Sequence, residues 1–333
     1  MEELHQLIGR ICLDHDNDED GLWRTLTETG LDRAGIPERF GGTGGDPADA
    51  LAVAAALAEH GAATPVADQS VLAGWLAARA GIRLPTGLVV VAGDADLRSE
   101  NGQIHGTARR VPWASRAGHL LVPVATAPDR TAVALVRVEQ VRVRPGRNLA
   151  DEPRDDVEFA AVVPDESRTV AAPAHDTLLH RAALVRAVQI AGSLRAVLRM
   201  TLRYSTERVQ FGRRLSQLDV VRQQVALMAG EVAATSAAVG AAVDQLLLAN
   251  DTDATRFAVA AAKVQAGTAA TAVARAAHQV HGAIGVTREY PLHRHTRRLW
   301  AWRDESGGEE FWARRLAALV HGADRPLWET LVG

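Results

Sequence analysis

The segment 279–285 holds the residues whose types and spacing best fit a ligand-binding site. It reads Gln-Val-His-Gly-Ala-Ile-Gly and follows a long segment with helical periodicity. Gly282 is expected to end that helix in a turn, because glycine adopts backbone conformations that other residues avoid. Such a turn can leave backbone N–H groups free to bind the phosphates of a cofactor. The alternative interpretation is an ordinary helix C-cap.

The wider stretch 276–303 is rich in basic and aromatic side chains, a combination that apolar core packing does not require. It also contains a group of histidines: His278, His281, His293 and His295. These histidines span a turn and lack carboxylate or cysteine ligands in register with them, so no metal site is predicted.

Composition and charge exclude several classes of protein. The net charge of −3 over 333 residues gives no reason to expect nucleic-acid binding. No apolar run reaches the roughly 18 residues that a membrane span needs, and the amino terminus lacks the pattern of a secretory signal. The one cysteine, Cys12, excludes an internal disulfide and a cysteine-based zinc site. These features predict a cytoplasmic protein without a membrane span.

The elements that must position the ligand-binding turn fall into three predicted domains. Residues 1–82 show helical periodicity, with Asp46 and Pro47 as the cap and first position of one helix. One apolar stripe in this region consists of Leu4, Leu7, Ile8 and Ile11.

Residues 83–172 are predicted to form a small antiparallel β-barrel or sandwich. The short β-prone runs are Leu88–Val91, His119–Val124, Ala132–Val138, Val141–Val143 and Val157–Val163. Turn residues separate most of these runs. A parallel sheet is not expected, because no helices intervene.

Residues 173–333 are predicted to form a helical bundle, with long helices at about 176–206, 217–250 and 254–281. The middle helix has apolar residues at alternating steps of four and three, which is typical of a bundle seam. These residues are Val221, Val225, Met228, Val232, Val239, Val243 and Leu246. The predicted fold class is α+β multidomain, in the order helical domain, β domain, four-helix bundle.

Three motifs together resemble the acyl-CoA dehydrogenase family. Residues 35–45, Gly-Ile-Pro-Glu-Arg-Phe-Gly-Gly-Thr-Gly-Gly, are similar to its amino-terminal signature. Residues 208–212, Arg-Val-Gln-Phe-Gly, resemble its Arg-x-x-Phe-Gly motif, and residues 279–285 resemble its Gln-x-x-Gly-Gly-x-Gly turn. The motifs occur in the family's order and span most of the chain.

The resemblance implies the cofactor FAD, bound between two subunits. The two carboxyl-terminal motifs would hold its pyrophosphate and adenosine end, and the β domain of the neighbouring subunit would hold the isoalloxazine ring. The implied cofactor-binding residues are Arg208, Phe211, Gln279, Val280, Gly282 and Ala283. An arginine can form charge-assisted bonds to a diphosphate. Ala283 replaces the usual second glycine, which preserves backbone contact in a tighter space.

The implied reaction oxidises an acyl-CoA to its 2,3-enoyl-CoA. A carboxylate removes the α-proton, and it must face a dry pocket that raises its pKa. By spacing within the family pattern, Glu305 is the implied base, although Asp304 precedes it instead of tyrosine. A surface acidic turn that caps the last helix is the competing interpretation. The family's alternative base position falls at about Ala182, which cannot serve.

The β domain departs from the family in the half of the site that holds the flavin ring. No Glu-Pro-x-Ala-Gly-Ser-Asp-type loop occurs between Leu84 and Gly106, and the family's Trp-Ile-Thr is replaced by Arg110-Val-Pro112 followed by Trp113. The chain is therefore similar to the smaller subunit of heteromeric (α2β2) bacterial acyl-CoA dehydrogenases. The implied partners are a second subunit of the same family and an electron-transfer flavoprotein.

A steroid side-chain CoA thioester is one substrate that this resemblance implies. Two alternatives remain open from the sequence. One is a self-sufficient homo-oligomeric flavoenzyme of the family, and the other is a catalytically inactive structural subunit.

Overall fold

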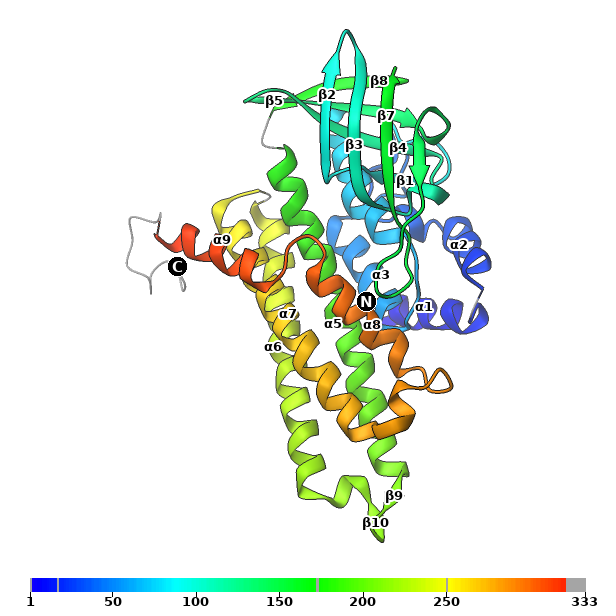
Figure 1. The fold of residues 1–333 in the computed structure, drawn as a ribbon, viewed down its shortest axis with the longest axis vertical. Helices are drawn as coiled ribbons and strands as arrows, with labels where there is room; N and C mark the ends of the chain where they lie inside the picture. Colours follow the sequence, from blue (N-terminus) through cyan, green and yellow to red (C-terminus); the bar gives the residue numbers. More distant parts are fainter. Residues whose placement is uncertain (1, 17, 172–173, 250, 322–333) are drawn as a thin grey trace. The chain divides into compact units, whose positions relative to one another are not determined.

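The computed structural model describes residues 2–16, 18–171, 174–249 and 251–321 (Figure 1). The chain divides into two compact units, Met1–Leu57 with Ala62–Val185, and Ala58–Gly61 with Arg186–Gly333. The first unit holds the amino-terminal helices and the strands, and the second is helical. The boundaries predicted between residues 82 and 83 and between 172 and 173 stay predictions.

The helices of the first unit pack around a small apolar core. They are α1 (Glu2–Asp14), α2 (Glu19–Glu28), α3 (Pro47–Glu59) and α4 (Gly74–Ala80). Ile8 and Ile11 are buried, whereas Leu7 is 38% exposed, so the predicted stripe is narrower than expected. The start of α3 agrees with the sequence, since Asp46 Oδ1 accepts hydrogen bonds from the backbone N–H groups of Ala48 and Asp49.

Two four-stranded sheets complete the first unit, in the orders β1-β4-β5-β8 and β2-β3-β7-β6 (Figure 1). Both contribute side chains to one core, which includes Val90, Trp113, Val122 and Phe159. The strands are β1 (Val89–Val91), β2 (Ala95–Glu100), β3 (Gln103–Pro112), β4 (His119–Ala127), β5 (Arg130–Arg137), β6 (Arg142–Arg144), β7 (Arg154–Val162) and β8 (Glu166–Ala171).

The expectation of purely antiparallel pairing is wrong at one place. β1 pairs with β4 in parallel, with Val90 opposite Leu120. Parallel neighbours need a crossover connection, which is usually a helix. Here the β2–β3 hairpin of the other sheet provides the crossover, so no helix is required.

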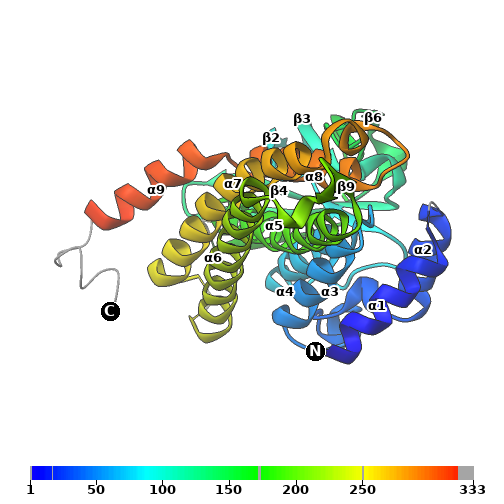
Figure 2. The same cartoon turned by 90° about the horizontal axis from the view of Figure 1, so that it is seen from below.

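The second unit is a bundle of long helices. α7 (Asp253–His281) packs against α6 (Asp219–Ala249), α8 (Leu292–Asp304) and α9 (Glu309–His321) (Figure 2). α5 (Ala174–Glu207) contributes its residues from Arg186 onward. The predicted seam of α6 is confirmed, since Met228 and Leu246 are 1% and 3% exposed. The buried face of α7 consists largely of alanine, which lets neighbouring helices approach closely.

Two of these helices are long and apolar enough to match a membrane span by length and composition. The α6 segment has a mean hydropathy of 1.5 with 28% of its window buried, and the α7 segment has 1.2 with 56% buried. Core helices of a bundle pass the same test. The prediction of no membrane span therefore stays a prediction.

A buried carboxylate fixes residues 58–61 in the second unit. Glu59 is 5% exposed, and its two oxygens lie 2.8 Å from Arg195 Nε and 2.6 Å from Arg199 Nη1. Burial would raise the pKa of Glu59, but hydrogen bonds from Arg199 and Arg195 outweigh burial and lower the pKa. Arg298 Nη1 donates to Gly61 O at 2.7 Å.

His295 lies beside this segment and is 6% exposed. Its ring is close to Gly61, and its Nδ1 lies 3.4 Å from Ser193 Oγ. Burial, with further repulsion from Arg298, Arg199 and Arg294, lowers the pKa of His295 to about 3. The imidazole is therefore neutral at physiological pH.

The buried His295 makes stability depend on pH. The unfolded chain takes up a proton on this group near pH 6.5, whereas the folded chain does so only near pH 3, so the free energy of unfolding falls as pH drops through that window. In urea unfolding, the decrease in the free energy of unfolding between pH 7 and pH 5 should be about 1–2 kcal/mol smaller for His295→Gln than for the native protein. Equal losses in both proteins would contradict the assignment.

Candidate functional site

The Arg208 motif forms a tight hairpin at the end of α5. Strands β9 (Val209–Gln210) and β10 (Arg213–Arg214) are joined by Phe211 and Gly212, whose φ angles are 54° and 75°. Two consecutive left-handed residues match the twist of a two-residue hairpin. Arg208 is exposed, and Phe211 is 85% exposed. The hairpin, which Figure 1 shows at the end of α5, therefore carries an exposed cation and an exposed aromatic ring.

The second motif forms the predicted turn at the end of α7. Gly282 has φ 62° and ψ −142°, a conformation that favours glycine, and its N–H donates to His278 O. Gln279, Gly282 and Ala283 are exposed, while Val280 is buried. A Cβ atom built on Gly282 would meet nothing within 4 Å. Backbone conformation, and not crowding within this chain, is the structural reason for glycine here.

The structure brings the two motifs together within the second unit. Val280 packs with Leu215 and Val221 in one small apolar cluster, which connects the end of α7 to the base of the hairpin. Tyr204 stacks on His281 with ring centroids 4.5 Å apart, and its hydroxyl donates to His281 O at 3.4 Å. Sequence reasoning missed Tyr204, although it lies one helical turn before Arg208.

The buried side chain of His281 packs at the end of α7, next to the turn. It is 3% exposed, its Nδ1 lies 2.7 Å from Ala277 O, and its ring lies 4.9 Å from that of Tyr290. Burial lowers the pKa of His281, so its ring is neutral in the stack. Among the described residues, no group of three or more His, Cys, Asp or Glu side chains could hold a metal ion.

These features fit the diphosphate and adenosine end of a dinucleotide. Arg208 supplies a positive charge, Phe211 an exposed ring and Gln279 an exposed amide. Gly282 and Ala283 supply exposed backbone at a helix end. Each group is of the type that binds phosphates or packs on a base. We call Arg208, Phe211, Gln279, Val280, Gly282 and Ala283 the clamp.

Glu305 lies directly after α8, where its N–H donates to Ala301 O. Its Oε2 lies 2.8 Å from Arg186 Nε, and the two side chains are 18% and 5% exposed. Arg186 also donates from Nη1 to Gln189 Oε1 at 2.6 Å. The site is largely dry, as a base requires, but a buried cation holds the carboxylate. This pair could not be predicted from the sequence, because no periodic pattern relates an arginine in a helix to a glutamate more than a hundred positions away.

The β segment that the family resemblance assigns to the flavin ring forms part of the β core instead. Trp113 is 2% exposed and packs inside the two sheets. Pro112 pairs with Arg154 in the β3–β7 ladder, and Val111 is buried. These residues complete the β core, and Pro112 has no N–H to offer a ligand.

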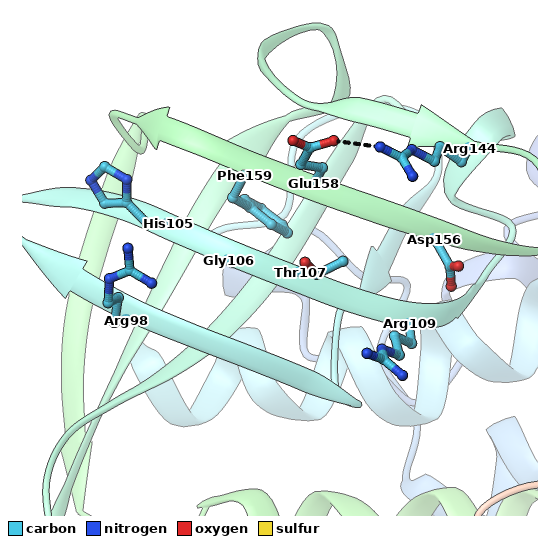
Figure 3. A pocket seen from close by; sticks show the side chains of 9 residues that line it. All are labelled: Arg98, His105, Gly106, Thr107, Arg109, Arg144, Asp156, Glu158 and Phe159. Carbon is cyan, nitrogen blue, oxygen red and sulfur yellow. Dashed lines mark hydrogen bonds and ion pairs between the residues drawn. The ribbon is translucent and has the colours of Figure 1, made fainter.

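An open pocket of about 600 Å³ lies on the outer face of the β2-β3-β7-β6 sheet (Figure 3). Basic and acidic side chains share its lining, and Arg144 is paired with Glu158 at 3.1 Å. The lining residues are Arg98, His105, Gly106, Thr107, Arg109, Arg144, Asp156, Glu158 and Phe159. None of the predicted site residues lines this pocket, and its mixed charge favours no single class of ligand.

Comparison with known families agrees with the motifs. Residues 2–82 match the acyl-CoA dehydrogenase N-terminal domain, and residues 173–320 match the acyl-CoA dehydrogenase C-terminal domain. Acyl-CoA dehydrogenase IpdE2 of Mycolicibacterium smegmatis is 27% identical over 305 residues, which cover 91% of this chain and 88% of that protein. Acyl-CoA dehydrogenase FadE27 of Mycobacterium tuberculosis is 28% identical over 302 residues, which cover 82% and 81%.

Solved structures share the whole fold. The ChsE4-ChsE5 complex from Mycobacterium tuberculosis contains a chain that superposes with a TM-score of 0.87 at 24% identity, covering 97% of this chain and 98% of that one. A variant of the Tcur3481-Tcur3483 steroid ACAD gives 0.85 at 25% identity, covering 96% and 97%.

The backbone at Gly282 should be sensitive to a single methyl group. Gly282→Ala should lower the free energy of unfolding by about 1–3 kcal/mol through backbone strain alone. Gly240 is a matched control, since it lies within α6 and has equally open space around it. Gly240→Ala should instead raise the free energy of unfolding by about 0.5–1 kcal/mol. Chemical denaturation of the full chain measures both, and a neutral Gly282→Ala would show that the turn relaxes.

Proposed function

Because the chain belongs to the acyl-CoA dehydrogenase family of oxidoreductases, we propose that it is an FAD-dependent acyl-CoA dehydrogenase subunit. With a partner subunit of the same family, it would convert an acyl-CoA to its 2,3-enoyl-CoA. One observation carries this proposal: the clamp is assembled on one unit with all of its residues except Val280 exposed, while Trp113 and its neighbours fill the place of a flavin-ring contact.

The clamp residues would hold the cofactor through its adenosine diphosphate end. Arg208 would form charge-assisted bonds to the diphosphate, and Phe211 would pack against the cofactor. Gln279, Gly282 and Ala283 would allow close approach of the dinucleotide. Val280 would act indirectly, by packing in the apolar cluster that holds the turn against the hairpin. FAD, when bound, supplies hydride acceptance.

Glu305 is the proposed base for the α-proton. Its side chain is 18% exposed and lies 2.8 Å from Arg186 Nε, so it has the largely dry surroundings that a base requires. The same ion pair also favours the alternative that the chain is a catalytically inactive structural subunit, because Arg186 occupies an oxygen of the carboxylate that a base would use. The presence of both Glu305 and the clamp in one chain favours the other alternative, a self-sufficient homo-oligomeric enzyme.

The composition of the outer face of α6 is consistent with contact to a partner subunit. Between Arg222 and Asp244, the exposed side chains of α6 are uncharged, and most belong to alanine, with Leu227 65% exposed. An uncharged helix face of this length is suited to close helix packing. We propose that a second family subunit covers it, as the names of the two related complexes suggest for those proteins.

A steroid side-chain CoA thioester is the proposed substrate class, by likeness to the steroid ACAD. The proposed electron acceptor is an electron-transfer flavoprotein, and the proposed location is the cytoplasm.

Cofactor content separates the proposed function from its alternatives. Expressed alone, the chain should bind much less than one FAD per chain, and co-expression with a family partner should restore FAD binding and acyl-CoA oxidation. Absorbance of the flavin against protein concentration gives the ratio, and dye reduction gives turnover. One FAD on each isolated chain, with turnover, would rule out the heteromer.

Glu305→Gln tests the base in the purified complex. Loss of the carboxylate should lower kcat by about a hundredfold or more, while FAD content stays unchanged. Glu310→Gln is the matched control, because Glu310 is 84% exposed and pairs only at the surface with Arg314. Intact activity in Glu305→Gln would exclude Glu305 as the base of this complex and leave the base to the partner.

A further inference from the structure

Lys263 is the only lysine in a chain with 37 lysine and arginine residues. It lies on the buried face of α7 and is 1% exposed. Lysine is among the side chains least often buried. A chain that otherwise uses arginine for positive charge thus places its single lysine in the interior of the bundle.

The ammonium group of Lys263 binds the end of α8. Nζ donates to Arg303 O at 2.6 Å and to Trp302 O at 3.3 Å. Carbonyl groups in the last turn of a helix lack intrahelical partners, and a cation there interacts favourably with the helix dipole. A compact ammonium with three rotatable donors can converge on two adjacent carbonyls, which suits lysine better than the planar fork of arginine.

The segment after α8 is held at several further points. Arg186 binds the Glu305 carboxylate, and Trp312 Nε1 donates to Ser306 O at 2.8 Å. The side chain of Glu309 packs on α7 at Gly267, where a Cβ atom would lie 2.7 Å from Glu309 Cγ. Helices α5, α7 and α9 therefore all contribute to the position of residues 304–309.

We propose that Lys263 and Arg186 are positioning residues for Glu305: Lys263 fixes the backbone of the preceding helix end, and Arg186 fixes the carboxylate. The proposal rests on the proposed function for its catalytic consequence, whereas the structural part can be measured without activity. The two cations act at different points, since Lys263 contacts main chain and Arg186 contacts the side chain.

The energetics of Lys263 indicate a role in positioning. Burial lowers the pKa of Lys263 from 10.5 to about 8; Glu309, Glu305 and Asp304 oppose this shift, and Arg186 adds to it. Because the folded pKa lies below the unfolded one, the unfolded chain binds more protons between pH 8 and 10.5, and this group favours folding more as pH rises through that window. At neutral pH its burial costs stability, so stability alone does not explain its presence.

The first test compares three variants of the complex with its partner and FAD. Lys263→Met keeps most of the length of the side chain and removes the charge, and Arg186→Met removes the other cation with a shorter apolar side chain. Arg168→Met is the control, since Arg168 is 58% exposed on β8. Hydrogen exchange of the amides in 302–309 should rise about tenfold or more in Lys263→Met and stay native in the control.

The kinetic readout distinguishes positioning from general damage. Both Met variants should lose about tenfold or more in kcat while FAD content and KM stay within about twofold of native, because a misplaced base affects the chemical step. Unchanged exchange in 302–309 would overturn the positioning role. A native complex that binds no FAD would instead overturn the proposed function, and the exchange result would still stand.

The second test uses the unmodified chain, so it does not depend on whether a variant folds. Labelling with ε-¹³C-lysine gives one side-chain signal, because Lys263 is the only lysine. The signal should titrate with a midpoint near pH 8. A midpoint near pH 10.4, the value for an exposed lysine, would refute the buried contact with α8.

Discussion

Buried charge is the constraint on which the helical bundle depends. Glu59, Lys263 and Arg186 are each 5% exposed or less, and an unpaired charge in such a place would cost several kcal/mol. Each therefore requires a partner on another segment at hydrogen-bonding distance. Arg195 and Arg199 illustrate the consequence, because they are spaced one helical turn apart and reach the same carboxylate. Because each charge must reach its partner, the ion pairs fix the alignment of the segments along their axes. Alanine-rich surfaces alone would leave this alignment loosely specified.

The sequence predicted elements well where one face is buried along many residues. The three long helices of the bundle lie within a few residues of the predicted ranges, because each helix extends over about eight turns or more and long periodic segments are predicted best. Strands β2, β3 and β8 were missed. β2 and β8 lie at sheet edges and carry mostly exposed polar side chains, whereas β3 is central, but its pairing with β7 is interrupted by register shifts and its few buried residues do not alternate. The parallel β1–β4 pair was missed because the connecting strands belong to the other sheet, which local pattern cannot reveal.

The candidate site likewise has one part that could be predicted from the sequence and another that could not. Motif spacing located the hairpin and the turn, and the structure places them on one apolar cluster. The residues that support them could not be predicted. Tyr204 meets His281 across 77 positions, and Lys263 meets the end of α8 across about 40. Such contacts depend on how helices are arranged in space, and no periodic rule within one sequence relates the two members of each pair.

Phe211 illustrates how a residue can be unfavourable for the chain that carries it. Its backbone is left-handed and its ring is 85% exposed, so asparagine would suit the hairpin tip better in both respects. Directed evolution of the isolated chain for heat resistance alone should therefore replace Phe211 early, whereas selection for growth that depends on the complex should retain it. The residue would then report which selection a given lineage has experienced.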